Sequence, residues 1–212
     1  MHPATNKEPE QPFFPDPIDE AKLDYTYFGC SMQQNRYALL AVNILLEYSA
    51  PARILEFGTR FGGLSVFLGM YAKNAGIPFH TYDIENQVKY SDFFNFLGVQ
   101  FHRCDIFSEQ ARREVSGLIR QPGRTLLFCD AIKAKEFTLY ADDLKHDDVI
   151  LAHDYAENER DFNTIKKQNI WWHCEINDSD IAGACRKNNL VPVFKSLFRT
   201  AAWCCFVKKT IS

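Results

Sequence analysis

Short apolar runs alternate along the chain with segments whose apolar residues recur every three or four positions. The runs are typical of buried strands and lie at 53–57, 78–84, 99–104, 124–130 and 148–153. The segments with helical spacing lie between or beside these runs, at 37–46, 64–75, 108–119, 134–144 and 179–188. Strands that alternate with helices of this length predict an α/β fold with a parallel, doubly wound, Rossmann-like sheet.

The last two predicted strands break this alternation. About six residues separate 190–194 from 201–207, whereas the connection between two parallel strands takes a dozen residues or more. We therefore expect a mostly parallel sheet with a C-terminal antiparallel strand.

Composition divides the chain into an arm and one domain. Residues 1–24 carry five prolines among acidic residues, and such a segment cannot bury enough apolar surface to fold alone. We predict a flexible arm over 1–24 and one domain over 25–212. Residues 155–178 exceed an ordinary connection, so we expect this insertion to lie on the substrate side. Its Trp171 and Trp172 fit stacking on an aromatic or sugar substrate, core packing, or an oligomer contact, and the sequence leaves these open.

Charge and cysteine content argue against several partners. A net charge of −3 and a pI of about 6.1 offer no basic field to nucleic acid or an anionic membrane. No apolar run approaches the ~20 residues that span a bilayer, so we expect a cytoplasmic protein. The seven cysteines contain no C-x-x-C pair, which indicates reduced thiols rather than a zinc site. A homo-oligomer is compatible with the sequence.

The strand at 53–57 runs into a glycine turn that opens a helix, with the sequence EFGTRFGGLS over residues 56–65. Such a turn lets the backbone approach a ligand, and the helix start offers unpaired N–H groups to an anion. A dinucleotide pyrophosphate requires glycine where Arg60 stands. S-adenosyl-L-methionine (SAM) has no pyrophosphate and tolerates a side chain there, so we expect SAM on this loop, with Glu56 facing its ammonium group. The alternative is a strand–turn–helix without a ligand.

Acidic residues follow the next two strands, at the edge where open α/β sheets bind ligands. Asp83 ends its strand 25 residues after Gly58, where an acid accepts hydrogen bonds from ribose hydroxyls, and Glu85 competes for this role. Asp105, with Ile106 beside it, is placed to meet an adenine ring. Each acid also fits a turn or cap residue.

Three ligating side chains end the fourth and fifth strands: Asp130, His153 and Asp154. They predict a divalent metal, since oxygen ligands favour magnesium, calcium or manganese and one imidazole shifts the preference toward manganese, iron or zinc. Lys133 is a candidate base if burial or a nearby metal lowers its pKa. The alternatives are that His153 is a core histidine, that Asp154 is a helix cap and that Lys133 is a solvated surface residue.

Three features give the chain a family resemblance: Glu56-x-Gly58-x-x-x-Gly62, Asp83 after the second strand, and the closing antiparallel pair. Over residues 25–208 it resembles the class I SAM-dependent methyltransferases. The stretch 29–33 and the Gly-Thr-x-x-Gly-Gly of 58–63 are similar to the cephalosporin hydroxylase and rhamnosyl O-methyltransferase group. Residues 130–133 and 152–154 are similar to the Asp-His-Trp-Lys and Ala-Asp-Asn motifs of catechol O-methyltransferase.

The resemblance implies O-methylation of a small hydroxylated acceptor, with SAM as cofactor and magnesium or manganese as metal. The residues that it implies are the cofactor-loop residues Gly58, Thr59, Gly62 and Ser65, the ribose ligand Asp83, the metal ligands Asp130, His153 and Asp154, and the base Lys133. In this chain His153 replaces a carboxylate of the catechol enzyme. A non-catalytic SAM- or nucleoside-binding regulatory protein is the alternative, and Arg60 disfavours a nicotinamide oxidoreductase.

Overall fold

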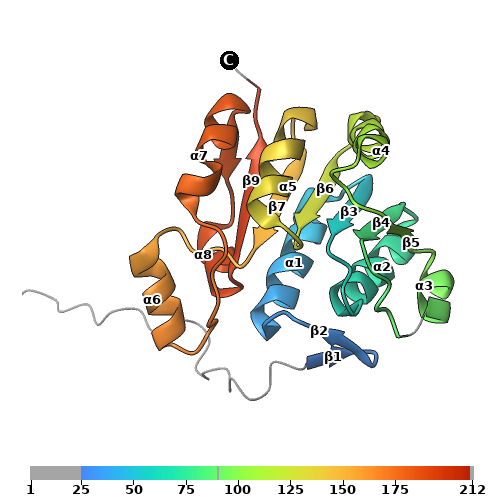
Figure 1. Cartoon of the computed structure of the whole chain (residues 1–212), viewed down its shortest axis with the longest axis horizontal. Helices are drawn as coiled ribbons and strands as arrows, with labels where there is room; N and C mark the ends of the chain where they lie inside the picture. Colours follow the sequence, from blue (N-terminus) through green and yellow to red (C-terminus); the bar gives the residue numbers. More distant parts are fainter. Residues whose placement is uncertain (1–24, 90, 211–212) are drawn as a thin grey trace, which may run out of the picture.

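The apolar runs of the sequence form one seven-stranded sheet with the order β5-β4-β3-β6-β7-β9-β8 (Figure 1). The computed structural model describes residues 25–89 and 91–210, so the predicted arm lies outside the described residues. Five neighbouring strands pair in parallel: β3 (Arg53–Phe57), β4 (Phe79–Asp83), β5 (Gln100–Arg103), β6 (Thr125–Cys129) and β7 (Val149–His153). β9 (Trp203–Lys208) runs antiparallel to both β7 and β8 (Leu190–Pro192), which confirms the predicted fold class and its reversed final strand.

Helices cover both faces of this sheet (Figure 1). One face packs against α1 (Arg36–Ser49), α2 (Gly63–Ala75) and α8 (Lys195–Thr200), and the other against α4 (Glu109–Arg120), α5 (Lys133–Tyr140) and α7 (Asp178–Lys187). Because successive strand residues point to opposite faces, Ile54 joins the first core while Leu55 and Phe57 join the second. In the described part of the chain, no helix is long and apolar enough to cross a membrane.

Several short elements have no counterpart in the sequence-based prediction. They are the hairpin of β1 (Tyr25–Tyr27) and β2 (Cys30–Met32), α3 (Ser91–Leu97), α6 (Glu159–Lys167) and α8, whereas the 3-10 helix η2 (Ala141–Asp143) lies within the helix predicted over 134–144. Most span three to seven residues, which is too short for a helical or strand period to stand out. The hairpin matters for the site, because it leads directly into α1.

Side-chain caps fix where two of the helices begin. The Ser108 hydroxyl accepts from the Ala111 backbone N–H at the start of α4. The Asn35 side chain accepts from the backbone N–H groups of Tyr37 and Ala38 at the start of α1. Gln34 directly precedes this cap.

Candidate functional site

A cavity of about 650 Å³ opens at the carboxyl ends of the parallel strands. Segments that follow β3, β4, β6 and β7 line it, together with residues 31–34 before α1 and residues 171–175 of the insertion. Its size lies within the ~300–1,000 Å³ of small-molecule sites. This is the edge at which the topology predicted a ligand.

The glycine loop and the end of β4 form one wall of the cavity. Gly58 has φ 94°, and a β-carbon there would lie 2.7 Å from the carbonyl carbon of Asp130, so this position requires glycine. The Asp83 carboxylate accepts from the backbone N–H of Arg60 at 2.8 Å and from that of Glu85 at 3.1 Å. Asp83 therefore ties the loop to β4, and both Asp83 and Thr59 line the cavity.

Three other predicted loop residues do not line the cavity. Glu56 is 1% exposed and accepts hydrogen bonds from the Ser65 and Thr81 hydroxyls beneath the loop. Burial raises the pKa of Glu56 to about 8, against the smaller opposing effect of these two hydroxyls, so the carboxyl is neutral at pH 7. Gly62 turns the chain into α2 with φ 85°. The structure thus corrects the expectation that Glu56 and Ser65 face the ligand.

The predicted adenine contacts are also displaced. The Asp105 side chain accepts from the Phe107 backbone N–H in a local turn, and Ile106 is buried in the core. Neither lines the cavity, whereas Ile84 and Ile132 do, with 66% and 57% of their surface exposed. Ile84 directly follows β4, but the sequence-based prediction counted it as the last residue of that strand and so missed it as part of the cavity wall.

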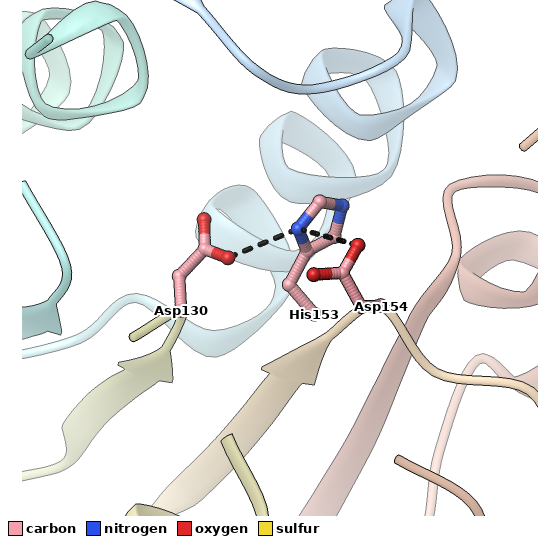
Figure 2. Close-up of side chains that lie close together, drawn as sticks. All are labelled: Asp130, His153 and Asp154. Atoms are coloured by element: carbon pink, nitrogen blue, oxygen red, sulfur yellow. Dashed lines mark hydrogen bonds and ion pairs between the residues drawn. The ribbon is translucent and has the colours of Figure 1, made fainter. Parts of the chain in front are cut away.

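The predicted metal ligands lie together at the ends of β6 and β7 (Figure 2). His153 Nδ1 is 3.0 Å from Asp130 Oδ1 and 3.5 Å from Asp154 Oδ1. Because metal–ligand bonds of about 2.1 Å place neighbouring ligand atoms about 3 Å apart, this donor set fits one divalent ion. His153 Nε2 is buried and has no hydrogen-bond partner among the described residues.

In the absence of a metal, the two carboxylates favour the protonated form of His153. Burial lowers the pKa of His153, but Asp130 and Asp154 outweigh it and raise the pKa above its ordinary value. Burial raises the pKa of Asp130. For Asp154 the raising effect of burial is outweighed by His153 and Lys133, so its pKa is lowered. Two carboxylates thus converge on a position that favours positive charge.

Lys133 extends this cluster to the insertion. Its Nζ lies 2.8 Å from Asp154 Oδ2 and 2.8 Å from Glu175 Oε2, and its side chain is 9% exposed. Burial lowers the pKa of Lys133, but Asp130 and Asp154 outweigh it, so its pKa is raised and the group is an ammonium. The predicted base role therefore requires another cation to neutralise Asp154.

Gln34 is a site residue that the sequence did not reveal. Its Oε1 accepts from Trp203 Nε1 at 2.7 Å, and its Nε2 donates to Asp130 Oδ2 at 2.7 Å. Since an indole N–H can only donate, Trp203 fixes which end of the amide faces Asp130. No local pattern could indicate this contact, because Gln34 and Asp130 are 96 positions apart.

Comparison with known proteins supports the same type of fold. No protein-family model and no curated protein sequence matches the chain. An apo structure of CmcI matches with a TM-score of 0.65 and 15% identity, over 100% of this chain and 91% of that chain. A CmcI structure described as Mg-SAM has a TM-score of 0.61 and 14% identity, over 97% of this chain and 89% of that chain. A putative caffeoyl-CoA O-methyltransferase from Staphylococcus aureus has a TM-score of 0.56 and 16% identity, over 83% of this chain and 84% of that chain.

At these identities the likeness is one of fold. The chain has the mostly parallel, Rossmann-like fold of SAM-dependent methyltransferases, with the reversed strand near its C-terminus. This is the fold that the resemblance in the sequence implied.

Proposed function

We propose that the protein is a SAM-dependent methyltransferase that methylates a hydroxyl oxygen of a small molecule. One observation carries the proposal: the glycine loop with Asp83 and the cluster of Asp130, His153 and Asp154 line the same cavity. Methyl transfer requires the acceptor oxygen, the methyl carbon and the sulfur to be held in one line. A cofactor wall next to a charged acceptor wall provides that arrangement.

The cofactor wall matches the chemistry of SAM. Backbone N–H groups at the start of α2 suit the carboxylate of its amino-acid part. Asp83 has carboxylate oxygens that can accept from ribose hydroxyls, and the exposed Ile84 and Ile132 offer apolar surfaces to the adenine. Similar structures described as Mg-SAM and SAH support this choice of cofactor.

The acceptor wall supplies orientation and a place for the proton. The acceptor oxygen attacks the methyl carbon in line, a C–O bond forms as the C–S bond breaks, and the electron pair stays on sulfur. The hydroxyl proton goes to the Nζ of Lys133, the candidate base, once that amine is neutral. Asp130 belongs to this wall, and a cation held by Asp130 and its neighbours would favour loss of the Lys133 ammonium proton to solvent, which leaves the amine neutral.

A divalent ion at Asp130, His153 and Asp154 would supply Lewis-acid chemistry that lowers the pKa of a hydroxyl. The donor geometry supports such an ion, and the imidazole of His153 favours manganese over magnesium. We therefore expect Mn²⁺ to bind more tightly than Mg²⁺. Gln34 would hold the remaining Asp130 oxygen in place, as hydrogen-bonded partners of metal ligands commonly do.

Calorimetry with SAM tests the cofactor site. We expect Asp83→Ala to weaken SAM binding at least tenfold, because both of its oxygens organise the cofactor wall. Asp105→Ala is the matched control, since it also follows a strand but does not line the cavity. No SAM binding by the wild type would contradict the proposal. SAM binding without transfer to any hydroxylated acceptor would favour the non-catalytic alternative.

A further inference from the structure

Two neighbouring tryptophans of the insertion have different surroundings. Trp171 is 8% exposed, donates its indole N–H to Asp154 Oδ1 at 2.9 Å and packs against the His153 ring. Trp172 is 49% exposed and lines the cavity. Both residues line the cavity, but Trp171 is held by Asp154 and exposes little surface, whereas Trp172 offers a large apolar surface to a ligand.

The polar groups beside Trp172 already bind one another. Glu175 Oε2 pairs with Lys133, and Glu175 Oε1 lies 2.8 Å from His173 Nε2. Lys133 also pairs with Asp154. A ligand with many hydroxyls would have to break several of these contacts. Of these groups Lys133 and Asp154 are buried, and a buried polar group left unpaired costs about 1–3 kcal/mol.

We propose that Trp172 is the stacking surface for the acceptor, and that the acceptor is a planar aromatic molecule with a hydroxyl on its rim, not a sugar. This inference rests on the proposed function and specifies its acceptor. A flat ring on the Trp172 indole gains apolar and aromatic contact. A single rim hydroxyl needs only one place in the Lys133–Glu175 network, so most of the polar contacts on that wall persist.

The three tryptophans allow a direct binding test without turnover. Trp203 does not line the cavity and Trp171 lines it with only 8% of its surface exposed, so Trp172, at 49%, offers by far the largest indole surface for direct quenching by a ligand there. The protein is saturated with S-adenosylhomocysteine and titrated with 2,3-dihydroxynaphthalene, its saturated counterpart decalin-2,3-diol, and a methyl glycoside. We expect quenching by the aromatic diol and binding at least tenfold weaker for the other two probes.

Variants separate stacking from general packing. We expect Trp172→Leu to weaken the aromatic diol about tenfold, Trp172→Phe to retain most of the affinity, and Phe96→Leu to have no effect. Phe96 is the matched control because it is 64% exposed and does not line the cavity. Affinities are measured by calorimetry, which does not depend on the substituted fluorophore.

Three results would overturn the inference: unchanged affinity of Trp172→Leu for the aromatic diol, a saturated diol or glycoside that binds as tightly, or no binding of the aromatic diol. SAM binding is measured on the same samples. If SAM binds and any of these results is obtained, the inference about Trp172 and the aromatic acceptor fails while the proposed function stands. If the wild type binds no SAM, the proposed function itself fails.

Discussion

Replacing Glu56 with glutamine tests how the glycine loop is supported. Ser65 and Thr81 both donate to one oxygen of the buried Glu56 carboxyl group. A glutamine amide keeps that acceptor and resembles the protonated carboxyl in shape. Burial raises the pKa of Glu56 from 4.5 to about 8, so the folded protein holds a proton that the unfolded chain has lost.

The sign of the pH effect follows from this difference. A raised folded pKa gives stability that is fully present below pH 4.5 and is lost as pH rises through 8. At about 1.4 kcal/mol per pH unit, the proton on Glu56 lowers the free energy of unfolding of the wild type by about 2 kcal/mol as pH rises from 6 to 7.5.

We therefore expect the free energy of unfolding of Glu56→Gln to rise by about 2 kcal/mol relative to that of the wild type between pH 6 and pH 7.5. Urea unfolding at a series of pH values, followed by circular dichroism, measures the difference. Contributions of other groups cancel, because both proteins contain them. Parallel stability curves for the two proteins would refute a neutral, buried Glu56.

Three further predictions follow from single contacts. Gly58→Ala should abolish SAM binding or destabilise the fold by more than about 1 kcal/mol, because the φ of 94° and a β-carbon 2.7 Å from Asp130 are both unfavourable. Calorimetry measures the SAM binding and thermal unfolding the stability, and a variant that matches the wild type in both would contradict the prediction. Gln34→Leu should weaken Mn²⁺ binding by about 10- to 100-fold with SAM affinity unchanged, while Gln33→Leu, also on the cavity wall, should leave both intact. Burial and His102 lower the pKa of His80 to about 4, so the free energy of unfolding should fall by up to about 3 kcal/mol as pH drops from 6.5 to 4. His80→Gln should remove that loss, and a variant with the same pH profile as the wild type would contradict the prediction.

Local patterns were enough to predict the position of the cavity. The glycine turn, Asp83 and the rim of Asp130, His153 and Asp154 each follow an apolar strand, and parallel strands bring their carboxyl ends to one edge. The reversed final strand followed from the length of one connection. These features depend on residues close together in the chain, so the sequence contains the information.

The direction of individual side chains could not be predicted in this way. Glu56 stands in a strand that is buried along its whole length, and only its neighbours in space decide that it points beneath the loop. Trp171 and Trp172 have the same chemistry, yet a hydrogen bond to Asp154 holds only the first in the interior. Gln34 reaches Asp130 through the packing of α1 beside the sheet.

The same limit applies to charge. Lys133 was a candidate base because it follows Asp130 by three positions. Its pKa is raised by Asp130 and Asp154, which follow β6 and β7, and its ammonium binds Asp154 and Glu175 of the insertion. The chemical role of Lys133 is therefore a property of the assembled site.

A crystal structure determined with SAM and MnCl₂ tests the central claim most directly. Anomalous scattering locates manganese independently of any assumed ligands. We predict one manganese peak among Asp130, His153 and Asp154, with SAM in the same cavity against Gly58 and Asp83. SAM bound elsewhere, or manganese bound away from these three side chains while SAM occupies the cavity, would contradict the account.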